Sequence, residues 1–288
     1  MFEGAYTALV TPLRDGKLDE DRLRKQVAFQ LDSGVDGLVP VGTTGESPTL
    51  SHAEHNRVVA VVIEAADGKV PVIAGTGSNS TSEALGMTRH AAQAGATASL
   101  QVVPYYNKPT QEGLYGHFMT IAEQVDLPLV LYNIPGRSAV ALSAQTIIRL
   151  AEHPNIVAVK EATGIMDMTS EIAAGCDLDI LSGDDSLTLP IMSLGGKGVI
   201  SVVSNIIPDQ IARMCHLALE GDFAEARKHH LKLFPLFKAM FVETNPIPLK
   251  TAMRLMGMDT GEMRLPLCEL SELYLPRIEQ ALRDQKLR

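Results

Sequence analysis

The chain has 288 residues, 45% of them hydrophobic, so it can bury one large core, either in a single barrel-type domain with additions or in two small domains. Its net charge of −9, with both signs mixed along the sequence and no basic run, excludes nucleic acid and anionic membranes as natural partners. Cys176, Cys215 and Cys268 lie far apart, which argues against a disulfide framework or a zinc site. Residues 1–9 lack a signal-peptide pattern and no apolar run could span a bilayer, so we expect a cytoplasmic protein.

Eight apolar segments rich in β-branched residues are predicted to be strands, at residues 5–10, 37–41, 70–74, 99–103, 127–131, 156–159, 179–181 and 198–203. Between them, apolar residues recur with the helical period. Two pairs, Ser51 with Glu54 and Ser80 with Glu83, are typical of capping boxes that start helices.

Strict alternation of strands and helices indicates parallel pairing through right-handed crossovers, and eight such units close a (β/α)8 TIM barrel. A doubly wound open sheet is the alternative. It is weakened because Val10-Thr11-Pro12-Leu13 stands where a glycine-rich dinucleotide fingerprint would follow the first strand.

Only helical patterns remain after about residue 222. They run over residues 222–240, interrupted at Pro235, over 248–256, stopped by Gly257, and over 266–282. We therefore predict a catalytic barrel of residues 1–221 and a C-terminal helical region, or appendage, of residues 222–288.

Catalytic groups of a parallel barrel gather at the carboxyl ends of its strands, and Lys160 ends the predicted sixth strand. A primary amine there is costly to desolvate. Burial lowers the pKa of a lysine, and a neutral amine can attack a carbonyl to form a Schiff base. The structural alternative is a lysine that extends to solvent or pairs with Glu161.

Other reactive groups end the neighbouring strands. Tyr132 could relay protons to an amine at Lys160, or could be a packing residue with a hydrated hydroxyl. The adjacent hydroxyls of Thr43 and Thr44 suit a carboxylate, or form a polar turn. Arg137 could clamp a second carboxylate through two hydrogen bonds, or simply lie on a loop.

Phosphate and metal ligands are disfavoured. Asp184 and Asp185 follow the seventh strand, where phosphate-binding barrels carry their anion site, and would repel it. His52 and His55 have a workable spacing for a metal on one helix but lack a third ligand in the sequence, so a solvated helix face is favoured.

In their joint order and spacing, these motifs resemble the pyruvate-dependent class I aldolases and, within them, the dihydrodipicolinate synthases (4-hydroxy-tetrahydrodipicolinate synthases). The resemblance covers nearly the whole chain and rests on residues 4–8, 42–46, 132–135, 159–161 and 245–248. It implies that Lys160 forms an imine with pyruvate, whose enamine attacks L-aspartate 4-semialdehyde. The product would be 4-hydroxy-tetrahydrodipicolinate, in the first committed step of diaminopimelate and lysine biosynthesis. No metal or organic cofactor is implied.

The resemblance also assigns roles to the remaining site residues. It implies a proton relay of Thr43, Tyr132 and Tyr106, with Tyr106 supplied by a neighbouring subunit, in a family that is usually a homotetramer built as a dimer of dimers. Thr44 would bind the pyruvate carboxylate together with Thr43.

The rest of the substrate pocket follows from the same resemblance. Arg137 would receive the carboxylate of the semialdehyde. Gly183 and Ile200 would line the pyruvate pocket.

A second site is implied at a subunit interface, where feedback-inhibited members of the family bind lysine. Its residues here are Ser47, Pro48, His52, His55, Asn79, Glu83 and Tyr105. Glu83 could pair with an ammonium group, whereas Asn79 and Tyr105 could hold a carboxylate. Pro48 departs from the small residue expected at its position. We expect lysine to inhibit the protein.

Three alternatives to this synthase remain. Sialic acid lyases and sugar-acid aldolases of the same fold share the lysine and the tyrosine, but would have to accommodate a polyhydroxylated chain beside Arg137. A non-catalytic barrel with a binding or regulatory role is the second, since fold alone does not fix function. A sugar-phosphate aldolase is the third, and is disfavoured by the acidic loop after the seventh strand.

Overall fold

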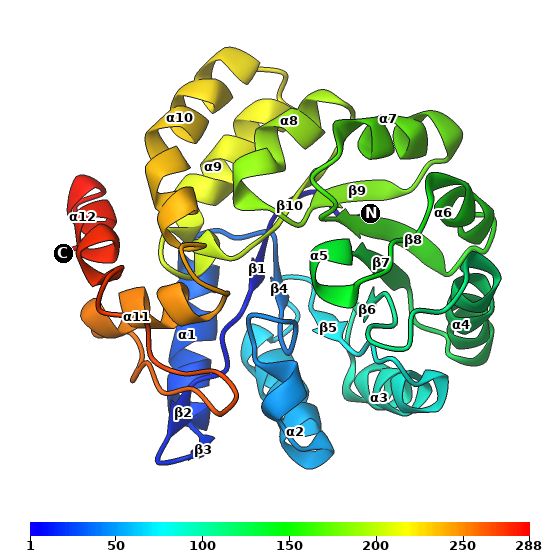
Figure 1. The fold of residues 1–288 in the computed structure, drawn as a ribbon, viewed down its shortest axis with the longest axis horizontal. Helices are drawn as coiled ribbons and strands as arrows, with labels where there is room; N and C mark the ends of the chain where they lie inside the picture. Colours follow the sequence, from blue (N-terminus) through cyan, green and yellow to red (C-terminus); the bar gives the residue numbers. More distant parts are fainter.

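A computed structural model describes residues 1–288, and its main feature is a barrel of parallel strands surrounded by helices (Figure 1). The eight barrel strands are β1 (Gly4–Ala8), β4 (Gly37–Val39), β5 (Ile73–Gly75), β6 (Ala98–Val102), β7 (Leu129–Asn133), β8 (Ile156–Glu161), β9 (Asp179–Ser182) and β10 (Gly198–Ser201). They are paired in the order β4-β1-β10-β9-β8-β7-β6-β5, and a single parallel bridge from Leu38 to Val72 joins the remaining seam. The predicted TIM barrel is thereby confirmed.

One helix or more follows each strand. The outer layer consists of α1 (Glu20–Asp32), α2 (His52–Ala66), α3 (Thr81–Ala94), α4 (Gln111–Gln124), α6 (Ala144–Leu150), α7 (Met166–Gly175), α8 (Thr188–Ser193) and α9 (Pro208–Leu219). Shorter elements lie on the loops, namely β2 (Leu13–Arg14), β3 (Lys17–Leu18), η1 (Ser47–Thr49), α5 (Pro135–Ser138), η2 (Asp185–Leu187) and η3 (Val203–Asn205). None of the helices combines the length and apolar character that a membrane crossing requires.

The strands read as nearly continuous apolar runs because both of their faces are buried. A cluster of 12 buried residues fills the barrel interior, including Tyr6, Tyr132 and Ile200. A second cluster of 35 residues packs the outer face of the sheet against the surrounding helices. Side chains that alternate along each strand therefore serve two different cores, and those at the strand ends border the site.

The C-terminal region comprises α10 (Phe223–Ala239), α11 (Ile247–Leu255) and α12 (Leu275–Asp284). It shares a core cluster of 27 buried residues with α9, β1 and β10. Pro235 lies within α10 and does not interrupt it, because the buried Leu233, Leu236 and Phe237 hold the helix on both sides of it.

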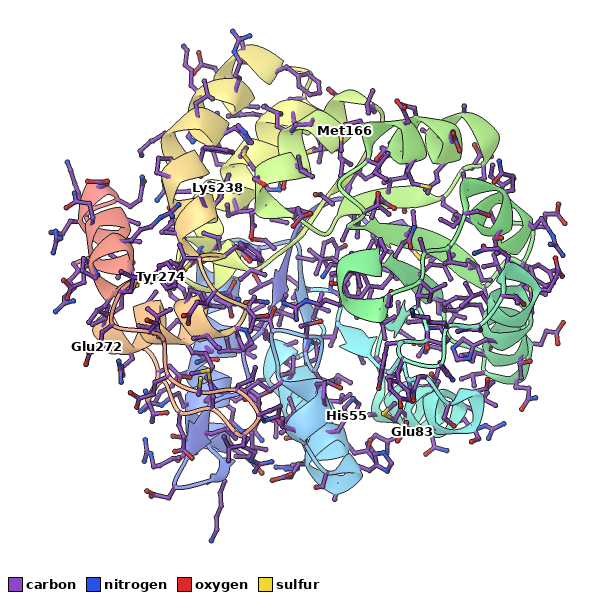
Figure 2. The ribbon with its side chains drawn as sticks, in the orientation of Figure 1. His55, Glu83, Met166, Lys238, Glu272 and Tyr274 are labelled. Carbon is purple, nitrogen blue, oxygen red and sulfur yellow. The ribbon has the colours of Figure 1, made fainter.

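The third C-terminal helix was predicted from residue 266 and begins at Leu275 instead. Figure 2 shows Glu272 and Tyr274 on the segment that precedes it. Leu265 and Leu273 are strongly exposed, so the apolar residues of this segment do not form a buried face. Pro276 lies in the first turn of α12, where its missing N–H leaves no hydrogen bond unmade.

One of the two predicted capping boxes is present. Ser51 accepts from the backbone of Glu54, and Glu54 accepts from the backbone of Ser51, at the start of α2. At the start of α3, Ser80 makes no capping bond. The second box was wrong because the Glu83 carboxylate instead binds Ser78 and His52.

Candidate active site

Lys160 and Tyr132 lie side by side at the carboxyl end of the barrel. They are direct partners in the register of β7 and β8, so both side chains point inward at the same level. The Lys160 amine lies 4.2 Å from the centroid of the Tyr132 ring. The predicted adjacency of these two strand ends is confirmed.

Burial lowers the pKa of Lys160 to about 8, and Asp184 and Asp185 partly offset this effect while Arg137 adds to it. The side chain is only 6% exposed. Its alternative partner Glu161 points to the other side of the strand, where it accepts from Thr163 and Asn133. Burial therefore increases the neutral fraction of the amine near physiological pH, and the neutral amine is the form that attacks a carbonyl.

Tyr132 connects this amine to the turn after β4. Burial raises the pKa of its phenol to about 12, opposed by the charge of Arg137 and by the nearby Thr43 hydroxyl. The phenol is therefore protonated at neutral pH and can donate to a group formed at Lys160. The Lys160 amine and the Thr43 hydroxyl therefore both lie near Tyr132, an arrangement suited to proton transfer.

The turn at residues 42–46 holds Thr43 and Thr44. A side chain at Gly45 would approach the Val41 backbone to 3.0 Å, so the turn packs closely on the end of the strand. Thr11 donates to the Gly45 carbonyl at 2.6 Å, and the Asn245 amide donates to the Thr44 hydroxyl at 2.9 Å. Because the Thr44 oxygen already accepts a bond, its O–H remains to donate, as a carboxylate requires.

Arg137 lies on α5, directly after β7. Its guanidinium donates to the Asn245 carbonyl at 3.2 Å. The same asparagine therefore contacts both Arg137 and Thr44, the two groups suited to carboxylates.

Gly183 follows β9, the strand next to Lys160, and Ile200 lies on β10, one strand further away. A Cβ at Gly183 would lie 2.6 Å from the Ala162 Cβ and 3.2 Å from the Lys160 Cε, so a side chain there would clash with Ala162 and crowd Lys160. Ile200 is fully buried in the barrel interior.

The two acidic residues of the loop after β9 have different surroundings. Asp185 is fully buried and accepts from the backbone of Val202 and Val203 and from Ser201, which anchors the end of β10. Burial raises its pKa to about 6. Asp184 faces Lys160, whose charge opposes the burial that raises the pKa of this carboxyl.

Tyr106 does not join this group within its own chain. Its side chain is 89% exposed, and its backbone adopts a left-handed conformation with φ of 71°. It does not line the cavity beside Tyr132.

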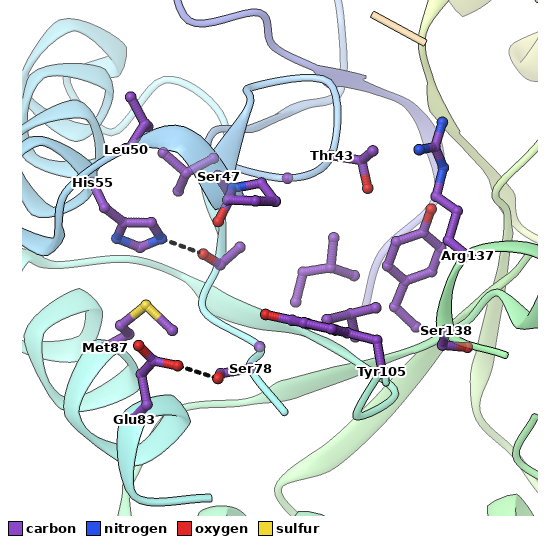
Figure 3. Close-up of a pocket in the computed structure, with 18 of the residues that line it drawn as sticks. Thr43, Ser47, Leu50, His55, Ser78, Glu83, Met87, Tyr105, Arg137 and Ser138 are labelled. Atoms are coloured by element: carbon purple, nitrogen blue, oxygen red, sulfur yellow. Dashed lines mark hydrogen bonds between the residues drawn. The ribbon is translucent and has the colours of Figure 1, made fainter. Parts of the chain in front are cut away.

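A cavity of about 450 Å³ is lined by three of the predicted active-site residues, Thr43, Tyr132 and Arg137, and by six of the seven residues predicted to bind lysine. Lys160 is not part of its lining. Figure 3 shows Thr43 and Arg137 at one end and His55, Glu83 and Met87 at the other. The lining also includes Ser47, Pro48, His52 and Tyr105, together with Leu50. Asn79 is outside the lining, and its carbonyl accepts from Asn107.

His52 and His55 do not form a solvated helix face together. His55 is buried and its Nε2 lies 2.8 Å from the Gly75 carbonyl, which fixes the ring, and burial lowers its pKa. His52 is exposed and its Nε2 lies 2.7 Å from the Glu83 carboxylate. No cluster of three or more His, Cys, Asp or Glu side chains is arranged to hold a metal ion.

Four residues that contact the turn or line the cavity were not predicted from the sequence. Asn245 and Lys250 contact the turn at residues 42–46 from more than 200 residues away, and only the presence of the NPIP stretch at residues 245–248 drew attention to this segment. Leu50 and Met87 line the cavity but have the ordinary pattern of helix-packing residues.

A (β/α)8 barrel with a buried lysine beside a strand-end tyrosine defines the class of Schiff-base lyases. The model of the dihydrodipicolinate synthetase family matches residues 1–285, so the chain belongs to this family and is an enzyme of that class.

Known proteins match over their full length. The 4-hydroxy-tetrahydrodipicolinate synthase of Methanocaldococcus jannaschii is 53% identical over 285 residues, which are 99% of each chain. A crystal structure of a dihydrodipicolinate synthase has a TM-score of 0.99 at 53% identity and covers 100% of both chains.

Two further solved structures hold ligands. The chloride-inhibited dihydrodipicolinate synthase of Acinetobacter baumannii, complexed with pyruvate, has a TM-score of 0.98 at 45% identity, with 100% of both chains covered. The enzyme of Cyanidioschyzon merolae, with lysine bound, has a TM-score of 0.97 at 44% identity, with 100% of this chain and 99% of that one covered.

Proposed function

We propose that the protein condenses pyruvate with L-aspartate 4-semialdehyde through an imine on Lys160, in the pathway to diaminopimelate and lysine. The observation that carries the proposal is the buried amine of Lys160 beside the Tyr132 phenol. The pyruvate complex of the Acinetobacter baumannii enzyme supports the first substrate.

The neutral Lys160 amine attacks the carbonyl carbon of pyruvate, and loss of water gives the imine. The positive imine nitrogen then withdraws electrons, so a proton leaves the methyl group and an enamine forms. The enamine carbon attacks the aldehyde and the new alkoxide takes a proton. The amino group from the semialdehyde finally displaces Lys160 as the product closes its ring. The imine acts as the electron sink, so no metal or organic cofactor is needed.

Each step moves a proton close to the Lys160 nitrogen, and Tyr132 with Thr43 provides hydroxyls there. Thr43 and Thr44 bind the pyruvate carboxylate beside Gly183 and Ile200. Arg137 binds the carboxylate of the semialdehyde.

The choice of aldehyde tests this function against a sugar-acid lyase of the same fold. Aspartate semialdehyde and N-acetylmannosamine are each supplied with pyruvate, and consumption of the aldehyde is measured. We expect turnover with the semialdehyde only, because the Arg137 guanidinium suits a carboxylate. Turnover of N-acetylmannosamine alone would assign the protein to the lyases.

Lysine is the inhibitor we propose for the second end of the cavity. Glu83 supplies a carboxylate for an ammonium group there, and the Cyanidioschyzon merolae enzyme with lysine bound supports this ligand. Wild type, Glu83→Ala and a control, Glu112→Ala, are assayed with millimolar lysine. Glu112 pairs with Arg149 on the surface and does not line the cavity. We expect inhibition of the wild type and the control only. Uninhibited wild type would end this proposal.

We further propose that the enzyme is a cytoplasmic homotetramer in which Tyr106 acts in the site of a neighbouring subunit. The exposure of the Tyr106 side chain in its own chain supports this role.

A further inference from the structure

The ion pair between Glu46 and Lys250 has both of its side chains fully removed from solvent. Their exposed fractions are 1% and 0%, and the Lys250 amine lies 2.7 Å from a Glu46 carboxylate oxygen. The amine also donates to the Thr11 carbonyl at 3.0 Å, and the other carboxylate oxygen accepts from the backbone of Arg264. The pair thus joins the turn at residues 42–46 to α11.

A buried pair of this kind is a poor source of stability. Removing two charges from water costs about as much as their attraction returns, so apolar residues of similar volume are often as stable. A hydrogen-bonded pair differs from an apolar contact because it holds its partners in one defined position. A buried ion pair is therefore most useful where the backbone must be held in one defined position.

The position that the pair fixes is that of the two threonines. Glu46 ends the turn in a left-handed conformation, with φ of 56°, three residues after Thr43. Lys250 also binds Thr11, and the Thr11 hydroxyl holds the Gly45 carbonyl. The Lys250 amine therefore holds Glu46 directly and Gly45 through Thr11.

We propose that Glu46 and Lys250 are positioning residues. They fix the turn at residues 42–46, so that the Thr43 and Thr44 hydroxyls are placed to act together with Tyr132 and Lys160. This inference rests on the proposed function, in which those hydroxyls bind pyruvate and relay protons. It makes α11 of the C-terminal region a part of the active-site support.

The test is the charge-free double variant Glu46→Gln/Lys250→Met. The new glutamine keeps an oxygen for the Arg264 backbone, and removal of both charges leaves no buried ion without a partner. We expect kcat/KM for pyruvate to fall at least about tenfold, with a higher KM and a lower kcat, because small misplacements of binding groups have effects of this order. A purely structural role would reduce the amount of folded enzyme and its melting temperature, but would leave the KM of the folded fraction unchanged.

Asp259→Asn is the matched control. Asp259 is buried and accepts from Gln26 at 3.2 Å, so it also ties the C-terminal region to the barrel, but without contacting the turn. We expect its pyruvate KM to match the wild type.

If the double variant does not fold, Glu46→Gln alone is measured in the same way, and the same loss is expected. Wild-type KM and kcat in the variant that folds would overturn the proposal. Failure of the proposed function can be distinguished from failure of the positioning role, because the wild-type enzyme would then form no borohydride-reducible adduct with pyruvate.

Discussion

The charge of Asp184 raises the pKa of the Lys160 amine, whereas burial lowers it by more. Only the neutral amine attacks pyruvate, so the rate of imine formation should rise with pH through about 8 and then level off. In Asp184→Asn the protonated amine loses this stabilisation, so its pKa falls and the profile moves to lower pH.

Borohydride quenching at short times, across the neutral and alkaline range, measures the imine formed. Asp177→Asn, which changes an exposed carboxylate, should retain the wild-type profile. A shift of the Asp184→Asn profile to higher pH, or no shift, would contradict the assigned electrostatics.

Tyr132→Phe keeps the ring beside Lys160 but removes the phenol hydroxyl, which lies near Thr43. We expect kcat of the condensation to fall by about 10²- to 10⁴-fold, the usual contribution of a positioned proton donor. The melting temperature should change little because the buried ring is retained. Steady-state kinetics and a thermal melt check both statements, and undiminished kcat would exclude the phenol from proton transfer.

The pairing of Lys160 with Tyr132 could be predicted because the carboxyl ends of parallel strands meet on one face of a barrel. The contact of Asn245 with Thr44, across 201 residues, could not be predicted in this way. It depends on where α11 packs, and no local periodicity contains that information. His55 was misplaced for a similar reason, since its burial follows from the approach of β5 rather than from its own helix.

At the level of elements, the two predicted capping boxes provide a matched pair of variants. Ser51→Ala removes the hydroxyl that caps α2 and should lower the free energy of unfolding by about 0.5–2 kcal/mol. Ser80→Ala should change it by far less, because Ser80 makes no capping bond at α3. Chemical denaturation of both variants measures the difference. Equal losses would show that the geometry of the two helix starts is not as described.

The positions of the strands could be predicted from composition. The helix starts could not, because a capping side chain can bind other polar groups instead of the helix backbone. Glu83 has the spacing of a capping residue, but its carboxylate is within reach of Ser78 and His52, which bind it instead. The segment at residues 266–274 has helical periodicity but exposes Leu273. A short helix is stabilised mainly by the packing of its apolar face, so helical periodicity alone does not ensure that a helix forms.

At the level of the whole molecule, we propose that residues 1–221 form the catalytic barrel and residues 222–288 a helical region folded onto it. Both regions contribute to one buried cluster of 27 residues. Asn245 and Lys250 reach the turn at residues 42–46 from the second region. The C-terminal region therefore contacts the turn that carries Thr43 and Thr44, and it extends the core.

The assignment of Tyr106 to a neighbouring subunit predicts complementation between two inactive variants. Tyr106→Phe and Lys160→Met are co-expressed so that mixed oligomers form. A mixed pair restores one site, in which Lys160 of one chain meets Tyr106 of the other, so random pairing should restore about a quarter of wild-type activity. Activity no greater than that of the separate variants would place Tyr106 outside the neighbouring site.

Borohydride trapping with pyruvate, followed by peptide mass mapping, identifies the lysine that forms the imine. We expect one reduced pyruvate adduct, on the peptide containing Lys160, and none in Lys160→Met. Lys250, although buried, should remain unmodified because its amine is paired with Glu46. Absence of an adduct, or an adduct on any other lysine, would contradict the assignment of Lys160 as the imine-forming nucleophile.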